Sequence, residues 1–488
     1  MPHTDLRELA FQMRADELRK YGQSILERDP SRVAAAEVLD LMGYLIECDF
    51  VGAEAKLATI KYRFRDTKDQ IYVEEATSLA KSHIDFAFGR FDELERSATD
   101  FLNHHSNLPT LEEGELLDVL RLLAQKAVLL DENEKLEAIY KEVTTYHSQE
   151  NSVNKLYLIN SVSAMYQLME GDFYKTQEVA LRNIEIARQN KYSGLMAPID
   201  SLFVLACCKA NLANKTESKV LFEEVMKLAE TLQQWPWYFM SEGIMAKDLA
   251  HAGKITESLA LVREQRRKLS QFTFNHNLNF IPDVNEMYAR YMIKDIERIE
   301  TLQTRVPNLI IVNQIRALVM EWQGQDMIKW IESLPERTSR EKIYKFIAFA
   351  EYYQDKESIS IEHMSQALAL VEKTGSVELV LKQHKLLDII LKAIAKHPTI
   401  FLEELASRMM ERVNLQHQNN QEGIPVPLTS RELEVVRHLA TGKPISAISN
   451  LLHVSMNTMK THLRNIYRKL EVDGREKAVE KAKALFLI

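Results

Sequence analysis

The sequence is poor in glycine and cysteine, and each scarcity excludes a class of protein. Only 14 of its 488 residues are glycine, whereas sandwiches, barrels and nucleotide-binding α/β folds use glycine in many of their turns. The three cysteines are Cys48, Cys207 and Cys208, and none stands in a CxxC pair, which excludes a disulfide framework. No apolar run reaches the ~18 residues that a membrane helix needs. The composition therefore predicts an all-α protein without a membrane span.

Signals for chemistry and for export are also missing. The opening residues, MPHTDLRELAFQMRADELRK, alternate charged and apolar residues and lack the apolar core of a signal peptide, which favours a cytoplasmic protein. The sequence contains no GxxxxGK[ST] phosphate loop. His83, His104, His105 and His384 have no carboxylate or cysteine at metal-ligand spacing. We therefore expect no metal, no cofactor and no enzymatic activity.

Charge is distributed unevenly along the chain. The whole protein carries a net charge of −8. Residues 428–488 contain 11 basic and 6 acidic residues, a net charge of +5, which leaves −13 for the rest. A small basic module on a large acidic body suggests that only the C-terminal segment meets a polyanion such as DNA.

Residues 1–413 repeat a helical pattern. Apolar residues recur at three- and four-residue spacing, as at Leu158, Val162 and Met165. Gly89, Gly171 and Gly253 each interrupt the pattern and lie 82 residues apart, and turn-like residues fall near the midpoints, at 131–133 and 211–214. The implied unit of about 41 residues fits a helical hairpin, which predicts an α-solenoid.

This body resembles a degenerate tetratricopeptide array, and an irregular helical bundle is the alternative. Beyond residue ~375 the helices lose the turn glycine and are interpreted as a terminal cap, which covers the last apolar face of an array. Residues 414–427, NLQHQNNQEGIPVP, are polar, contain glycine and proline, and are predicted to be a linker.

Residues 428–488 are predicted to form a small helical domain. Thr429 and Glu432 have the spacing of a capping box at the start of a first helix, whose buried residues would be Leu433, Val436, Leu439 and Ala440. Gly442 ends this helix, and Pro444 opens a second one. Ile448, Leu451 and Leu452 would face inward from the second helix. Ser455 is a good N-cap for a third helix over residues ~456–470.

The third helix has two distinct faces. Met459, Leu463, Ile466 and Leu470 form a core stripe. Lys460, Arg464 and Arg468 follow one another at four-residue spacing on a neighbouring face, and no acidic residue occurs between residues 453 and 470. Such a helix offers donors for base edges and cations for phosphates. A solvated basic face is the simpler alternative, but the preceding helix and turn favour DNA binding.

The segments LTSRELEVVRHLATG, VSMNTMKTHLRNIYRKLEV and REKAV closely resemble the LuxR-type helix-turn-helix. The resemblance implies a four-helix DNA-binding domain in which Lys460, Thr461 and Arg464 read bases. It also implies that Thr458, His462, Arg468 and Lys469 contact the DNA backbone or position the helix; for His462, simple packing is an equal alternative. Three positions depart from the family: Ala447, Pro444, and Glu471 in place of a helix-ending glycine, a role that Gly474 could assume.

A helical-repeat body ahead of such a domain resembles the sensor and output portion of the large MalT-like bacterial regulators, without their ATPase domain. This resemblance implies that the body receives a small effector, often a sugar, whereas the resemblance to other tetratricopeptide regulators implies a peptide or a protein. The aromatic residues Trp235, Trp237 and Tyr238 are candidates for stacking on such an effector, although ring packing between repeats is the simpler interpretation. The pair Arg266 and Arg267, together with Arg263 and Lys268, could bind an anionic effector, although a solvated helix face is the simpler interpretation.

The sequence therefore predicts a sequence-specific transcriptional regulator that binds double-stranded DNA through residues 428–488. Its helical body would sense an effector or partner. The alternative is an interaction scaffold that the C-terminal domain tethers to DNA. Paired half-sites in the family imply a homodimer on DNA, and Val479, Ala482, Leu485 and Phe486 could pair across it or close the core of the domain.

Overall fold

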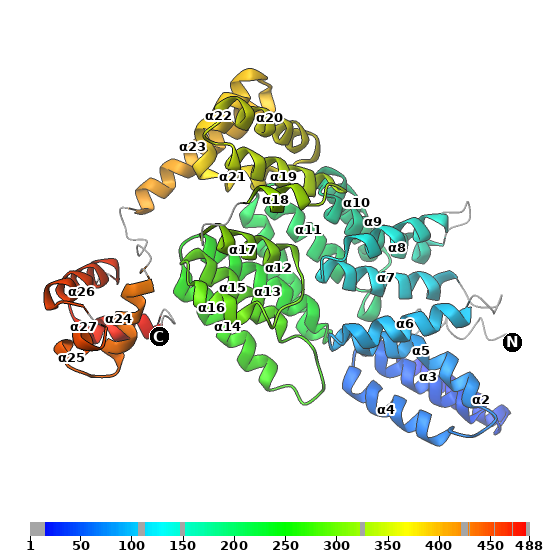
Figure 1. The fold of residues 1–488 in the computed structure, drawn as a ribbon. Coiled ribbons are helices and arrows are strands. Elements are labelled where there is room, and N and C mark those ends of the chain that lie inside the picture. The colour runs from blue at the N-terminus through cyan, green and yellow to red at the C-terminus, as the bar shows by residue number, and fades with distance from the viewer. Residues whose placement is uncertain are drawn as a thin grey trace. The chain divides into compact units, whose positions relative to one another are not determined.

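Every regular element in the part of the chain that the structure describes is helical (Figure 1). The computed structural model describes residues 15–105, 113–146, 152–322, 327–420, 428, 430–452, 454–470 and 472–484. The predictions of an all-α fold and of a solenoid-like body are confirmed.

The chain packs into two units. The first comprises Met1–Glu242, Phe272–Leu278 and Ile331–His397, and the second comprises Gly243–Gln271, Asn279–Trp330 and Pro398–Ile488. In the second unit, α23 runs from Ile400 to Asn420. The first seven residues of the predicted linker are thus helical, which agrees with their lack of glycine and proline, and residues 421–427 lie outside the described residues.

Antiparallel helical hairpins make up most of the body. The helices up to residue 242 are α2 (Ala15–Arg28), α3 (Val33–Ile46), α4 (Phe50–Arg63), α5 (Gln70–Ala87), α6 (Phe91–His105), α7 (Glu113–Leu129), α8 (Asn133–Thr145), α9 (Val153–Glu170), α10 (Phe173–Gln189), η1 (Gly194–Met196), α11 (Ile199–Asn211), α12 (Lys215–Thr231) and the start of α13 (Trp235–His251). The helices that follow are α14 (Ile255–Ser270), α15 (Phe280–Met292), α16 (Ile296–Leu302), α17 (Ile310–Trp322), α18 (Ile328–Ser333), α19 (Ser339–Tyr352), α20 (Glu357–Thr374), α21 (Val377–Leu381), η2 (His384–Leu386) and α22 (Leu387–Lys396).

One type of turn joins the two helices of seven hairpins within the described residues. Its key residue has a positive φ, between 55° and 85°, and successive key residues are 40 to 42 positions apart. The amide of the next residue donates to the carbonyl five residues earlier, as Asp172 does to Gln167 at 3.2 Å, which completes a Schellman motif. The key residues are Cys48, Gly89, Asp131, Gly171, Ala213, Gly253 and Lys294.

The residue after the key position often starts the next helix. The side chains of Asp49, Asp172, Asn214 and Asp295 each accept a hydrogen bond from the backbone amide three residues later, which caps the helix N-terminus. The turn therefore ends one helix and begins the next within two residues. The repeat of about 41 residues that the glycines predict is confirmed, and it is set by this turn.

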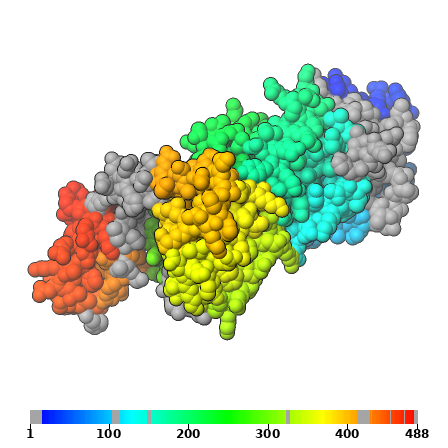
Figure 2. Space-filling view, turned by 90° about the horizontal axis from the view of Figure 1, so that it is seen from above, coloured from blue at the N-terminus to red at the C-terminus, as the bar shows by residue number. Residues whose placement is uncertain are grey.

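Helices α19 and α21 pack against the middle of the body instead of extending a row of hairpins (Figures 1 and 2). The contacts lie within the first unit, α19 with α9 and α21 with α11. The Ser376 hydroxyl donates to the carbonyl of Gly171 at 3.2 Å, and the Ser339 amide donates to Glu170 at 3.2 Å. A linear array contacts only sequence neighbours, so residues 331–397 do more than cap the end of the array.

Replacing Gly171 by alanine is expected to destabilise the first unit. A left-handed backbone costs an alanine about 1–2 kcal/mol, and the added Cβ would lie 2.7 Å from the Cβ of Arg340 and 3.0 Å from its backbone nitrogen. Thermal unfolding followed by circular dichroism measures the effect. In the matched control, Gly114→Ala in α7, no atom lies within 4 Å of the new Cβ, and the change should stabilise by about 0.5–1 kcal/mol. Equal midpoints for the two variants would contradict this account of the turn.

A charged cluster lies inside the first unit. Arg121 donates to Asp118 at 2.9 Å and to Asp200 at 3.2 Å, and His83 lies 2.7 Å from Asp118. Burial raises the pKa of Asp118, but the interactions with His83 and Arg121 outweigh it and lower the pKa to about 2. The spacing of residues in the sequence does not predict a carboxylate partner for His83, because His83 and Asp118 meet only through the packing of α5 on α7.

Candidate nucleic-acid interface

The C-terminal domain has four helices around its own apolar core. They are α24 (Ser430–Ala440), α25 (Ile445–Leu451), α26 (Met456–Leu470) and α27 (Arg475–Ala484). Its buried apolar residues are Leu428, Val435, Val436, Leu439, Ile448, Leu452, Met459, Leu463, Ile466, Leu470, Ala478 and Ala482. The four predicted core residues of the third helix are all in this set, so the inward face of α26 is confirmed.

Local signals set the ends of these helices. Gly442, at φ 75°, follows α24, and Pro444 is the N-cap of α25. The Ser455 hydroxyl accepts from the Thr458 amide at 3.1 Å and thereby caps α26. These three predictions are confirmed, whereas Thr429 of the predicted capping box lies outside the described residues.

The turn between α25 and α26 is held from several sides. The Val454 amide donates to the carbonyl of Ser449 at 3.1 Å, and the Ser449 hydroxyl returns a bond of 2.5 Å to the carbonyl of Val454. Arg431 of α24 donates to the carbonyl of Leu452. These bonds fix the angle at which α26 leaves the turn, and this angle decides how the helix meets a groove.

The outward face of α26 is cationic. Lys460, Arg464 and Arg468 are exposed and follow one another at four-residue spacing, so they lie on one side of the helix. Thr458 and Thr461 are exposed beside them, and the Thr461 hydroxyl donates to the carbonyl of Asn457 at 3.1 Å. An α-helix of this kind fits the major groove of duplex DNA and offers cations to its phosphates.

Two of the predicted backbone-contacting residues are less accessible. His462 is half-buried. The ammonium group of Lys469 donates to the Glu432 carboxylate at 2.6 Å, and the two side chains are 11% and 4% exposed. Because this ion pair joins α26 to α24, we expect Lys469 to position the helix and not to contact phosphate. Lys469 contacts the Oε2 atom of Glu432, the residue predicted to take part in the capping box at the start of α24.

Replacing Lys469 by methionine is expected to destabilise the C-terminal domain by about 1.5 kcal/mol, because a buried charge-assisted hydrogen bond is lost. Thermal unfolding gives the stability, and DNA affinity across a salt series gives the number of phosphate contacts. The salt slope should equal that of the wild-type protein, whereas Arg468→Met should lower it by about one. If Lys469→Met lowered the salt dependence of DNA affinity without changing stability, Lys469 would contact phosphate after all.

Some packing details differ from the predictions. The side chain of Leu451 was predicted to be buried but is 49% exposed, and Val435, which was not among the predicted core residues, is fully buried.

The end of α26 also differs from the prediction. Gly474 does not adopt a left-handed conformation, so it does not provide the glycine cap that the family has at the position of Glu471. Glu471 itself lies outside the described residues. Arg475, the first residue of α27, has a separate role at the end of α24. Its guanidinium donates to the carbonyl of Leu439 at 2.7 Å. Only the tertiary packing brings these two residues together.

The final helix belongs to the domain itself. Ala478 and Ala482 are buried in the domain core, and Val479 packs against it. Leu485 and Phe486 lie outside the described residues. Tyr467 also packs against this core, and burial raises the pKa of its phenol, which is therefore neutral at physiological pH.

The aromatic candidates of the body occupy different environments in the first unit. Trp237 is fully buried, with ring centroids 4.8 Å from Phe203 and 6.1 Å from Phe86. Trp235 and Tyr238 are half-buried, and the Trp235 ring lies 4.7 Å from that of Phe272. The side chains of Trp235 and Tyr238 are therefore partly accessible to solvent, whereas that of Trp237 is not.

None of the helices among the described residues combines the length and apolar character required to cross a lipid bilayer. This agrees with the sequence, in which charged residues interrupt every apolar run.

Comparison with known proteins places the C-terminal domain in a family. Residues 426–482 match the family described as bacterial regulatory proteins, luxR family. The HTH-type transcriptional regulator MalT of Yersinia pestis is 44% identical over 59 residues, which cover 12% of this chain and 6% of that protein. The family match covers α24, α25, α26 and most of α27, and it therefore includes the cationic face of α26.

The body also resembles a known regulator. The HTH-type transcriptional regulator MalT of Vibrio cholerae serotype O1 is 25% identical over 279 residues, which cover 56% of this chain. The C-terminal domain is only 61 residues long, from 428 to 488, so this alignment includes much of the helical body. The chain spans 27% of the length of that relative.

Proposed function

We propose that this chain, a DNA-binding transcriptional regulator with a LuxR-family domain, recognises one duplex sequence through α26 and receives an effector or a protein partner on its helical body. The observation that carries the proposal is the exposed row of Lys460, Arg464 and Arg468 on a helix whose opposite face closes the domain core. Duplex recognition needs such a helix: rigid, thin and cationic on one side.

The residues of α26 that are predicted to contact DNA have separate proposed roles. Lys460, Thr461 and Arg464 contact base edges, because they share the outermost side of the helix near its N-terminal half. Thr458 and Arg468 contact phosphates from either end of that side, and half-buried His462 orients the helix. Arginine suits Arg464's position, because its planar guanidinium can donate two hydrogen bonds to a guanine.

On DNA we propose a homodimer that binds paired half-sites, because two-fold sites match two-fold proteins. Val479 and Ala482 are already used in the domain core. We therefore do not assign the dimer contact to these two residues.

The body is proposed to receive the effector. Its half-buried rings Trp235 and Tyr238 offer apolar faces at the surface of the first unit, and such faces can stack on a sugar ring or an aromatic group. The fully buried Trp237 contributes packing only.

Selection from random DNA duplexes tests the proposal against a sequence-independent tether. The full-length protein should enrich a single motif, because base-edge contacts discriminate by about 1–3 kcal/mol per base pair. A variant that ends after Asn420 should enrich none. Recovery of unrelated sequences by the full-length protein would contradict the proposal and favour an interaction scaffold held on DNA by charge.

A further inference from the structure

The chain between α14 and α15 contains a segment, residues 272–278, that packs as part of the first unit (Figure 1). We call this segment the strap. It forms neither helix nor strand, and every second side chain faces the protein, where it is half-buried or fully buried: Phe272, Phe274, His276 and Leu278. The residues between them, at 273, 275 and 277, are exposed. Burial with a period of two is typical of an extended chain that lies on a surface.

The aromatic side chains of the strap contact aromatic rings of the first unit. The Phe274 ring stacks on that of Phe88, with centroids 4.1 Å apart and an interplanar angle of 16°. The Phe272 ring lies 4.7 Å from that of Trp235 and 6.0 Å from that of Phe239. Aromatic pairs at such distances stabilise a contact beyond the burial of their area. Two alternate positions of the strap are therefore held by rings that come from α13 and from the end of α5.

Leu278 holds the end of the strap beside the turn that joins α5 to α6. Its side chain is fully buried and lies against Gly89, where an added Cβ would overlap the Cδ2 atom of Leu278. Gly89 therefore has two roles. It adopts the positive φ of the turn, 66°, and it leaves the space that an apolar side chain of the strap fills.

Arg90 holds the backbone of the strap. Its Nε donates a hydrogen bond to the carbonyl of Asn275 at 2.8 Å. The guanidinium is itself fixed by two hydrogen bonds to Glu54, and it lies 4.8 Å from the centre of the Phe88 ring. A hydrogen bond to a backbone carbonyl does not depend on the side chain of the bound residue, whereas contacts with alternate side chains select the sequence. The two kinds of contact together are those by which proteins bind extended peptides.

The contacts of the strap can be replaced by those of a second peptide. The strap adds no helix or strand to the fold, and its three aromatic side chains stay partly exposed. Ordering such a segment costs conformational entropy at every residue, and irregular segments with partly exposed side chains are among those that open most easily. A competing peptide with the same pattern would restore the apolar contacts that the strap gives up.

We propose that the surface formed by Phe88, Gly89, Arg90, Trp235 and Phe239 is a docking site for an extended peptide segment of a partner protein, with aromatic or apolar residues at every second position. The strap occupies this site when the partner is absent. The proposal rests on the proposed function and names the partner class of the effector surface. An aromatic side chain fits better than a sugar, because the group that Trp235 contacts in the structure is the Phe272 ring.

The first test is fluorescence anisotropy of a labelled peptide with the sequence of residues 271–279, titrated with the full-length protein without DNA. The wild-type protein should bind it weakly, because its own strap is tethered to the site at a high effective concentration. Phe272→Ala/Phe274→Ala removes two rings from the strap but none from the surface, so this variant should bind the peptide at least tenfold more tightly. The matched control, Thr273→Ala/Asn277→Ala, changes two exposed side chains of the strap and should bind as the wild type does.

The second test is hydrogen exchange of the wild-type protein, which does not depend on the folding of a variant. An excess of the unlabelled peptide should speed exchange of the backbone amides of the strap at least fivefold and leave those in the middle of α5 unchanged. A peptide of the same composition with its two phenylalanines side by side should have no such effect.

Three outcomes would overturn the proposal: equal peptide affinity of Phe272→Ala/Phe274→Ala and the control variant, strap exchange that the peptide does not change, or equal activity of the rearranged peptide. Because both tests are carried out without DNA, the docking site can fail while the DNA-binding function stands. Selection from random duplexes can likewise fail while the peptide still binds.

Discussion

Replacing Ile466 by alanine is expected to abolish DNA binding while the helical body stays folded. The Ile466 side chain is fully buried at the centre of the C-terminal domain core. Removing a buried isoleucine to alanine costs about 2–5 kcal/mol, and a domain of this size rarely has more than about 3–5 kcal/mol of stability. The variant domain should therefore be largely unfolded.

Calorimetric unfolding and DNA binding of the same preparations provide the measurement. The transition of the C-terminal domain should disappear or shift strongly, and the transitions of the body should not move. Ile466→Val is the control, with an expected cost of about 0.5–1.5 kcal/mol and near-normal DNA binding. If Ile466→Ala bound DNA with wild-type affinity, the packing described for α26 would be incorrect.

Replacing Arg464 by alanine is expected to weaken binding to the specific site by about 1–3 kcal/mol, or about 5-fold to 150-fold, and to relax the preference at one base pair. Arg464 is exposed at the middle of the cationic row, and its side chain is not part of the domain core. Stability should therefore remain unchanged. Fluorescence anisotropy with the selected site and its single-base variants measures both effects.

Lys477→Ala is the matched control for Arg464→Ala. It removes the same unit charge from the same domain, but Lys477 lies on α27 and pairs with Asp473 at 2.9 Å. It should leave base preference unchanged. If Arg464→Ala and Lys477→Ala reduced affinity equally and neither changed base preference, α26 would contribute only general attraction to DNA.

The repeat of the body could be predicted because glycine marks three of its turns. Gly89, Gly171 and Gly253 have positive φ values, and their spacing of 82 residues is twice the true period. Cys48, Ala213 and Lys294 occupy the same conformation without glycine. Residue type alone does not predict these three turns. At each of them the Schellman hydrogen bonds and the packing of the hairpin offset the cost of a left-handed backbone, which is about 1–2 kcal/mol for a residue other than glycine. A better signal would have been the Asp or Asn that follows several of these positions.

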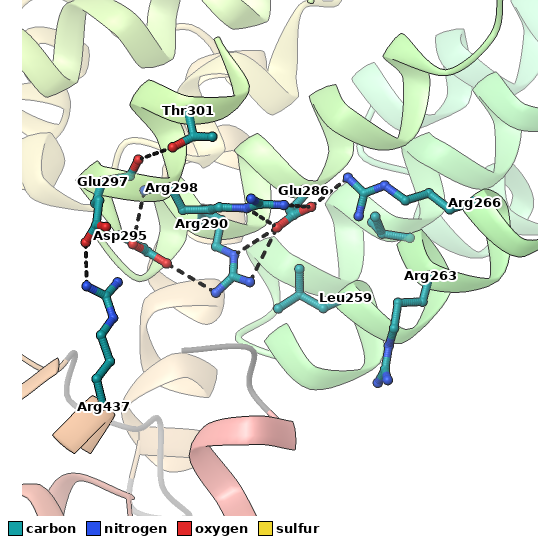
Figure 3. Close-up of a pocket in the computed structure, with 11 residues that line it drawn as sticks. Leu259, Arg263, Arg266, Glu286, Arg290, Asp295, Glu297, Arg298, Thr301 and Arg437 are labelled. Atoms are coloured by element: carbon teal, nitrogen blue, oxygen red, sulfur yellow. Dashed lines mark hydrogen bonds and ion pairs between the residues drawn. The ribbon is translucent and has the colours of Figure 1, made fainter. Parts of the chain in front are cut away.

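The return of residues 331–397 to the middle of the body was not predictable. It depends on bonds between residues more than 160 positions apart, such as Ser339 with Glu170. Periodicity describes which face of a helix is buried but not which helix covers it. For the same reason the cluster of Arg263, Arg266, Arg267 and Lys268 was predictable from the sequence, whereas the meeting of Arg266 with Arg290 and Arg298 at Glu286 depends on tertiary packing (Figure 3).

At the DNA interface, helical periodicity alone separated the two faces of α26. The core stripe through Met459 and Ile466 is buried, and Lys460, Arg464 and Arg468 are exposed as predicted. The role of Lys469 could not be derived in this way, because its partner Glu432 lies 37 residues earlier in the chain. A charged residue next to a buried stripe can face either solvent or a partner, and the sequence does not distinguish the two.

The most direct test of the central claim is genome-wide binding of three proteins at equal cellular levels: the wild type, Arg464→Ala and a variant that ends after Asn420. If α26 reads base pairs, the wild type should give discrete peaks that share a motif. Arg464→Ala should lose most of these peaks or change the motif at one position, and the truncated variant should give none. Diffuse binding by the wild type, or the same peaks with the truncated variant, would contradict the claim that the exposed face of α26 makes this protein a site-specific regulator.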